Sequence, residues 1–215
     1  MIQLIRKYLL LSILSFFFSI TSFVFPMDGF AGEKVYLEKG VFLVAKTGIG
    51  GQYFKQTVIL LIKHGREGTS GLIINRPSKH LLSSVLPGFK QFENSKELLF
   101  VGGPLKPHIP LLLLRAEEAP HGWVKIVDDV YYSHNIDIIA RKTKDKDVVQ
   151  SLRVYGGYAG WASGQLEAEI SRGGWSIEHA DAGSIFDKNP EDVWGDLIKK
   201  RETTPAGMML VNYEK

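Results

Sequence analysis

Short apolar runs separated by glycine-rich connections dominate the chain between residues 40 and 75. Residues 40–45 (GVFLVA), 57–64 (TVILLIKH) and 71–75 (GLIIN) are too short for typical helices and are rich in branched or aromatic side chains, which predicts three buried strands. The segment REGTSG between the second and third is typical of a turn. Since a parallel crossover needs a dozen or more residues, we expect these two strands to form an antiparallel hairpin.

Further apolar strands follow along the rest of the chain. They are predicted at Glu97–Val101 before a tight turn at 102–104, at Ile109–Arg115, at Gly122–Ser133 as one strand or a hairpin, at Leu152–Gly157 and at Ala182–Asp187. Pro110 suits a strand start or an edge because proline donates no ladder hydrogen bond. Strands outnumber helices without alternating strictly with them, which favours an α+β class with a mainly antiparallel sheet.

The clearest helix signal is the segment NPEDVWGDLIKKR, Asn189–Arg201. Asn189 fits the N-cap and Pro190 the first helical position, and acidic residues then precede basic ones in the order that the helix dipole favours. Its apolar stripe consists of Val193, Trp194, Leu197 and Ile198. Shorter helices are predicted at 79–86 after a Ser78 cap with Leu81, Leu82 and Val85 on one face, at 134–141 after a Ser133 cap, and at 164–170 starting from Ser163.

The N-terminal residues have the pattern of an export signal. Arg6 and Lys7 precede an uncharged apolar run over residues 8–25, and Gly29 and Ala31 provide the small residues of a cleavage site. We therefore expect residues 1–31 to be a cleaved signal peptide and residues 32–215 to form a single exported, periplasmic domain. An inner-membrane anchor through residues 8–25 is the alternative, because about 18 residues can just span a bilayer. A wrongly assigned start codon is a third interpretation.

Composition and charge limit the kinds of partner and site that the sequence predicts. The formal net charge is +3, and removal of residues 1–31 takes away two positive charges and one negative charge to leave +2, which is too little to predict a nucleic-acid partner. The sequence has no cysteine, so it has no disulfide and no thiolate site. Its six histidines are scattered without metal-ligand spacing, so we predict neither a metal nor another cofactor.

The densest glycine and aromatic block is VYGGYAGWASGQLEAEISRGGW, Val154–Trp175. We interpret it as a strand that ends in a tight glycine turn, with positive φ permitted at its glycines and a helix that follows. Gly173 and Gly174 then suit a left-handed helix stop. A structural role explains nearly every residue of the block. Exposed helix N–H groups beside Tyr158 and Trp161 can instead bind a small anion, and catalysis is a third possibility.

Several blocks together resemble the YqgE/AlgH family. They are GYAGWASGQLEAEI, FKQTVILLIKH, GTSGLIINRP, FVGGPL and the late IFD…PEDVW, and they extend over Leu37–Arg201. The resemblance implies one domain with a mixed, mainly antiparallel sheet curled into a partial barrel with flanking helices. It implies no established activity, although one branch of the family is linked to regulation of exopolysaccharide production. The chain departs from the family in its export signal and in having no histidine in Leu111–Arg115.

The blocks also provide candidate ligand-binding residues. Those carried over from the resemblance are Asn75, Arg76, Gly102, Gly103, Gly157, Tyr158, Gly160, Trp161, Gln165 and Glu167. The leading hypothesis is a non-enzymatic domain that binds a protein or a small anionic ligand. One version of this hypothesis gives the domain a regulatory role. Membrane contact is expected only through an uncleaved N-terminal segment. The alternative is a hydrolase that uses Glu167 or His64 as a general base near Arg76, and convergence of these three residues in one cleft would favour it.

Overall fold

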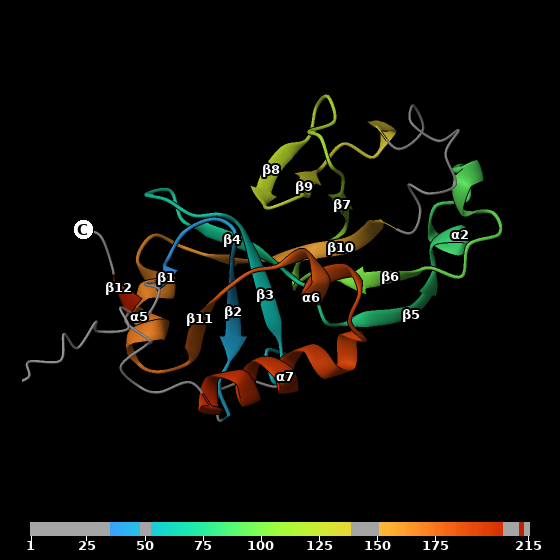
Figure 1. The fold of residues 1–215 in the computed structure, drawn as a ribbon. Coiled ribbons are helices and arrows are strands. Elements are labelled where there is room, and N and C mark those ends of the chain that lie inside the picture. Colours follow the sequence, from blue (N-terminus) through green and yellow to red (C-terminus); the bar gives the residue numbers. More distant parts are fainter. Residues whose placement is uncertain (1–34, 48–52, 139–150, 204–210, 213–215) are drawn as a thin grey trace, which may run out of the picture. The chain divides into compact units, whose positions relative to one another are not determined.

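The apolar runs form the strands of one curled sheet (Figure 1). The computed structural model describes residues 35–47, 53–138, 151–203 and 211–212, all within a unit that spans Gly32–Lys215. Eight strands follow one another in the order β11-β2-β3-β4-β10-β7-β9-β8, and every neighbouring pair is antiparallel. In sequence order they are β2 (Val41–Ala45), β3 (Val58–Lys63), β4 (Thr69–Ile73), β7 (Leu105–Arg115), β8 (Val124–Val127), β9 (Val130–Ser133), β10 (Leu152–Trp161) and β11 (Trp175–His179).

Two further strands branch from the centre of the sheet. β6 (Leu98–Val101) lies parallel to β10, and β5 (Pro77–Leu81) pairs antiparallel with β6. The sheet is therefore mixed but mainly antiparallel. It curls into a half-barrel with helices packed against it, which confirms the predicted α+β class. Separately, β1 (Val35–Tyr36) and β12 (Val211–Asn212) form a short parallel pair.

The strands around β2 and β3 are buried on both faces. Along β2, Leu43 and its alternate neighbours face the cluster that contains Leu166 of α5 (Gln165–Ser171). Phe42 and Val44 face the opposite cluster, which contains residues of α6 (Ala182–Phe186) and α7 (Pro190–Thr203). A strand covered on both faces loses the apolar–polar alternation of a half-exposed strand, which explains the uninterrupted apolar runs. A third cluster packs α2 (Leu82–Val85) and the 3-10 turn Lys90–Phe92 against β7 and β10.

Several predicted elements are confirmed. β3 and β4 form the expected antiparallel hairpin, and β8 and β9 show that Gly122–Ser133 is a hairpin rather than one strand. The helix α7 begins at Pro190, with Val193 and Leu197 buried and Trp194 half buried. In α5, Leu166 and Ile170 are buried and Gly173 has a φ of 80°, as expected for a left-handed stop.

Two predicted elements are wrong. Residues 182–187 were expected to form a strand, but Ala182–Phe186 is the helix α6, because the Asp181 side chain accepts a hydrogen bond from the backbone N–H of Ser184 and caps the first turn. The segment 79–86 was expected to be one helix after a Ser78 cap. Only Leu82–Val85 of it is helical, as α2, because β5 extends to Leu81 in pairing with β6, and the Ser78 hydroxyl accepts from the N–H of His80 within the strand.

Two predictions fall partly or wholly outside the described residues. Residues 139–141 of the predicted helix 134–141 lie there, while the Ser133 hydroxyl accepts from the Asn135 N–H at the end of β9. The apolar run 8–25 and the cleavage site at Ala31 also lie there. Among the residues that the structure describes, no helix has the length and apolarity needed to cross a membrane.

Candidate functional site

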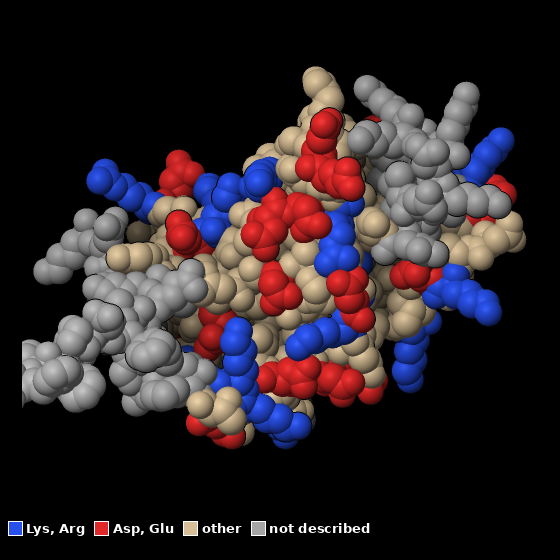
Figure 2. All heavy atoms as spheres, viewed as in Figure 1, with Lys and Arg blue, Asp and Glu red and all other residues tan. Residues whose placement is uncertain are grey.

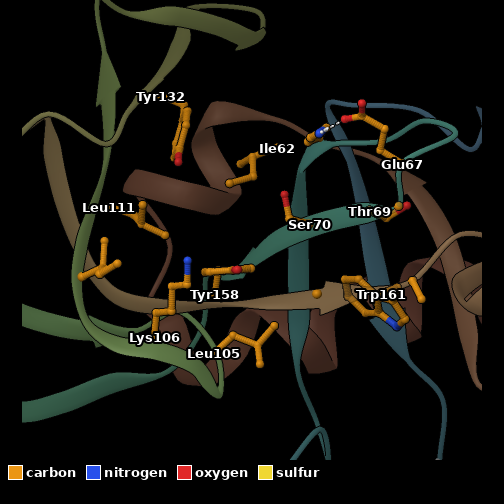
Figure 3. A pocket seen from close by; sticks show the side chains of 15 residues that line it. Ile62, Glu67, Thr69, Ser70, Leu105, Lys106, Leu111, Tyr132, Tyr158 and Trp161 are labelled. Atoms are coloured by element: carbon orange, nitrogen blue, oxygen red, sulfur yellow. Dashed lines mark hydrogen bonds and ion pairs between the residues drawn. The ribbon is translucent and has the colours of Figure 1, made fainter.

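An open cavity of about 550 Å³ lies where β3, β4, β7, β9 and β10 border the inside of the curled sheet (Figure 3). Its walls combine aliphatic and aromatic side chains with a few polar groups. Its lining includes Ile62, Ser70, Lys106, Leu111, Tyr132 and Tyr158. A concave, partly apolar space of this volume is of the size that small-molecule ligands occupy in proteins.

The glycines of the YGGYAG block lie inside β10 and not in a turn after it, which corrects the sequence-based interpretation. β10 continues to Trp161, and its pairing with β7 shifts between Gly156 and Tyr158, so that Gly157 forms a bulge with a φ of 72°. Gly160, for which a positive φ was expected, does not have one. The turn into α5 comes later, at Gly164, which has a φ of 75° and occupies the N-cap in place of Ser163.

The bulge exists because the segment after β6 lies directly against β10. A Cβ on Gly157 would come within 2.6 Å of the Leu105 carbonyl oxygen. A Cβ on Gly103 would overlap the peptide between Tyr158 and Ala159, and one on Gly102 would overlap the Gly157 carbonyl oxygen. These distances are far inside ordinary van der Waals contact. Glycine is therefore required on both sides of this approach for packing, in addition to its φ freedom.

The close approach shapes the start of β7 and places Lys106. On β10, the partners of Leu105 and Pro110 are Tyr158 and Gly156, which are separated by one residue. On β7, four residues lie between Leu105 and Pro110, so Lys106 and the three residues after it loop out of the strand pairing. Lys106 has a φ of 47°, in the left-handed region that lysine rarely adopts. Gln56 and Asp128 are the other non-glycine residues of the described chain with positive φ. Such strain persists only where surrounding structure enforces it, and it recurs at functional sites.

Figure 3 shows how the polar groups of the cavity are directed. The Lys106 side chain and the Tyr132 hydroxyl extend into the open space from opposite walls, the Ser70 hydroxyl is directed inward, and Tyr158 also lines the cavity. Burial raises the pKa of Tyr132, and the neighbouring Tyr158 adds to that shift. The Tyr132 hydroxyl therefore stays a protonated donor at neutral pH.

The rim of the cavity carries a second lysine whose charge is already paired. Lys63 Nζ lies 2.9 Å from Glu67 Oε2, and this ion pair lowers the pKa of Glu67. Lys106 makes no ion pair with any residue that the structure describes. Of the two lysines that line the cavity, the exposed Lys106 is therefore the one without an acidic partner among the described residues.

Trp161 and Gln165 belong mainly to a hydrogen-bonded cluster around Glu169, which the sequence analysis did not select. Glu169 Oε2 accepts from the indole N–H of Trp161 at 3.0 Å and from that of Trp175 at 2.9 Å. Gln165 Nε2 donates to Glu169 Oε1 at 3.0 Å, and Gln165 Oε1 accepts from the Ala162 N–H. The i,i+4 spacing of Gln165 and Glu169 was the available signal, but it does not show that two distant indoles converge there.

Asn75 and Arg76 lie at a different cavity, of about 380 Å³, between the loop before β3 and α7. The Asn75 amide bonds the Val58 N–H and the Gln56 carbonyl oxygen. The Arg76 guanidinium donates to the carbonyl oxygens of residues 53 and 55 and lies 5.4 Å from the ring centroid of Tyr53. Both side chains therefore fasten the loop to β4, and neither lines the larger cavity.

His64 and Glu167 do approach each other, whereas Arg76 does not join them. His64 Nε2 lies 3.9 Å from Glu167 Oε1, and His64 Nδ1 lies 2.8 Å from the hydroxyl oxygen of the buried Thr69. Two of the three residues proposed for hydrolysis are thus neighbours, and Thr69 completes a hydroxyl–imidazole–carboxylate array. Within the described residues, no group of three or more histidine or acidic side chains is placed to hold a metal ion.

The chain matches the AlgH-like family (DUF179) over residues 42–206, which is more than three quarters of its length. It belongs to the AlgH-like family. Curated relatives include a UPF0301 protein of Mycobacteroides abscessus, 30% identical over 175 residues that cover 80% of this chain and 84% of the relative. A UPF0301 protein of Mycobacterium tuberculosis is 30% identical over 186 residues, with coverage of 86% and 92%.

Two solved structures have the same fold as this AlgH-like chain. A crystal structure of a Corynebacterium diphtheriae protein aligns with a TM-score of 0.68 at 24% identity, covering 82% of this chain and 92% of that one. The solution structure of AlgH from Pseudomonas aeruginosa aligns with a TM-score of 0.62 at 28% identity, covering 77% and 88%. The resemblance seen in the sequence is confirmed at the level of family and fold.

Proposed function

We propose that this AlgH-like protein is a non-enzymatic binding protein whose site is the cavity beside β10, and that the ligand is a small organic anion. The observation that carries the proposal is the Lys106 ammonium, which is directed into a cavity of mixed polar and apolar lining and is not neutralised by a described acidic residue. Tyr132 and Ser70 add hydroxyl donors around the same space. A few convergent polar groups on apolar walls are the usual composition of a ligand site.

A small anion suits this surface better than a nucleic acid. On the face drawn in Figure 2, acidic and basic side chains of the described residues are interspersed, whereas nucleic-acid binding depends on clustered basic groups. The net charge of +3 for the whole chain argues the same way. A regulatory role would follow if ligand binding changed how the protein meets a partner.

The test is a titration of the isotope-labelled protein with a library of small organic anions, followed by amide chemical shifts. We expect the perturbed amides to cluster along β4, β7 and β10 around the cavity. Ser70→Leu, which fills the cavity from its wall, should abolish the shifts while the remaining spectrum stays that of the folded protein. Shifts confined to the Arg76 cavity, or no shifts with any anion, would refute the proposal.

Hydrolysis is the second candidate, favoured by the Thr69–His64–Glu167 array. If His64 carries its proton on Nε2 toward Glu167, Nδ1 is free to take the Thr69 hydroxyl proton as that oxygen attacks an ester carbonyl. The leaving alkoxide would take the proton, and water would then release the acyl group. Against this, the Thr69 hydroxyl belongs to a residue that is only 7% exposed, and His64 Nε2 lies 3.9 Å from Glu167 Oε1, beyond hydrogen-bond length, although Thr69 and Ser70 both line the larger cavity.

Model-ester hydrolysis separates the two candidates. An enzyme should lose its turnover in both Thr69→Val and His64→Gln, and an acyl group should be found on Thr69 by mass spectrometry. A binding protein should show only background hydrolysis, unchanged in these variants. Equal background in the wild type and both variants would eliminate this candidate.

We also propose that the domain is exported, since residues 6–31 have the pattern of a signal peptide. An in-frame alkaline phosphatase fusion after Lys34 should be active. Mass spectrometry of the mature N-terminus then separates cleavage after Ala31 from an anchor at residues 8–25. An inactive fusion from a stably expressed protein would remove the proposal.

A further inference from the structure

We infer that the ligand of the cavity is an amphipathic monocarboxylate, whose single negative charge meets Lys106 and whose apolar body covers the aliphatic wall. This inference rests on the proposed function and specifies its ligand. It follows from how the charged, hydroxyl and apolar groups are distributed in the cavity.

The charge of the ligand follows from the cations and acids around the cavity. Lys106 is its one cation without a described acidic partner, and the second lysine, Lys63, is held by Glu67 at 2.9 Å. A dianion bound at Lys106 would therefore bring a second negative charge into a cavity whose other lysine is already paired with Glu67. Lys106 therefore compensates one negative charge of the ligand, and no second unpaired cation of the described lining compensates another.

The shape of the head group follows from the donors around Lys106. The Tyr132 hydroxyl and the Lys106 ammonium extend into the cavity from opposite walls (Figure 3), and Tyr158, a neighbour of Tyr132, also lines it. A carboxylate has two acceptor oxygens, so one can take a charge-assisted hydrogen bond from Lys106 while the other takes the Tyr132 O–H. Because the pKa of Tyr132 is raised by burial, this donor persists through the neutral and mildly alkaline range.

The apolar body of the ligand is inferred from the aliphatic side chains that line the cavity. Ile62 and Leu111 project into the space, and Ile109 also lines it. Leu105 is 43% exposed at the mouth, which is unusual for a large aliphatic side chain inside a concave site. A hydrocarbon body would remove these surfaces from water, which stabilises the complex roughly in proportion to the apolar area buried.

The backbone at Lys106 gives independent support. Its φ of 47° costs stability for lysine but would be tolerated by asparagine, whose short polar side chain adopts the left-handed region more readily. A residue selected for packing alone would be expected to avoid this strain. Lys106→Asn should therefore keep or raise the melting temperature while it removes the cation, which separates binding from folding.

The experiment compares four eight-carbon probes with the full chain by amide chemical shifts: octanoate, octyl phosphate, 1-octanol and octylammonium. Octanoate should perturb the cavity amides and bind about tenfold more tightly than 1-octanol or octylammonium, since one charge-assisted hydrogen bond has about that effect. Octyl phosphate should bind more weakly than octanoate at a pH where it is a dianion. Lys106→Asn should remove the preference for octanoate, while the matched control Lys63→Gln should retain it.

The outcomes distinguish this inference from the proposed function. If 1-octanol binds as tightly as octanoate, or if Lys106→Asn keeps the preference, the inferred head group is wrong although the cavity still binds ligands. The same holds if octanoate fails while other anions of the library perturb the cavity. If neither octanoate nor any library anion perturbs it, both the inference and the proposed function fail.

Discussion

The carboxylate of Glu169 anchors two buried tryptophans, and its removal should be the most informative single change on the α5 side of the sheet. Trp175 is 1% exposed and Trp161 is 7% exposed, and their rings pack edge to face with centroids 6.1 Å apart. Both indole N–H groups donate to the same oxygen, Glu169 Oε2. Glu169→Ala leaves both donors without this acceptor.

The expected cost follows from the charge of the acceptor and the burial of the donors. A hydrogen bond to a charged group contributes about 1.5–3 kcal/mol, so complete loss of both would cost about 3–6 kcal/mol. Glu169 is only half buried, so water can replace the carboxylate for Trp161 more readily than for Trp175. We therefore expect Glu169→Ala to lower the free energy of unfolding by about 3 kcal/mol, or the melting temperature by about 6–12 °C for a domain of this size.

The assay is urea unfolding followed by far-UV circular dichroism, because tryptophan fluorescence would report the changed indole environment itself. Glu169→Gln keeps an acceptor oxygen and should lose about 1 kcal/mol. Glu167→Gln is the matched control, since its carboxylate is 39% exposed and its charged neighbour is His64 at 3.9 Å, and it should change stability by less than about 0.5 kcal/mol. If Glu169→Ala unfolds at the same urea concentration as Glu167→Gln, the two indoles do not depend on Glu169.

Two further predictions concern close packing and a buried acid. Gly103→Ala should give little soluble folded protein because its Cβ would overlap the backbone of β10. In Gly160→Ala the new Cβ meets only the tip of the Leu105 side chain, at 2.7 Å, so this variant should lose only about 1 kcal/mol of stability. Equal expression and equal melting temperatures of the two variants would contradict this prediction. Burial raises the pKa of Glu178 although Arg201 opposes the shift. The raised folded-state value favours the protonated form, so this contribution to stability is present at acid pH and is lost as pH rises through that value. Glu178→Gln should therefore melt no lower than wild type at pH 7, with any gain disappearing below about pH 4; a lower melting temperature at pH 7 would show that the ion pair outweighs burial.

Much of the fold could be predicted from local sequence patterns. The predictions failed for segments whose conformation depends on pairing with a distant part of the chain. The hairpin of β3 and β4 and the helix α7 were predictable because turn composition and capping lie within the elements themselves. The segment 79–86 has helical spacing, but pairing of β5 with β6 outweighs that preference over its first residues. The strand β11 escaped prediction because polar residues interrupt it, and its place is fixed by pairing with β2.

The candidate site residues also depend on distant parts of the chain that local sequence patterns do not reveal. Tyr158 and Trp161 could be selected as pocket residues because they are aromatic residues within a glycine block, and both line the larger cavity, whose ligand remains a proposal. Asn75 and Arg76 lie at another cavity and bind backbone carbonyls. Lys106 could not be selected from the sequence, since an isolated lysine after a glycine-proline turn is typical of any exposed loop. Its direction depends on the bulge at Gly157, more than 50 residues away.

The glycine-rich block and the cavity are therefore connected through packing rather than through glycine acting on a ligand. Gly157 and Gly103 allow the backbone before β7 to lie against β10, and that contact forces the excursion on which Lys106 adopts a positive φ. A larger residue at Gly157 would collide with the backbone of Leu105 and Pro107 beside Lys106, and one at Gly103 would collide with the backbone of the cavity residue Tyr158. The same substitution should consequently damage folding and remove the cation from the site, so only changes at Lys106 itself, such as Lys106→Asn, can separate the two effects.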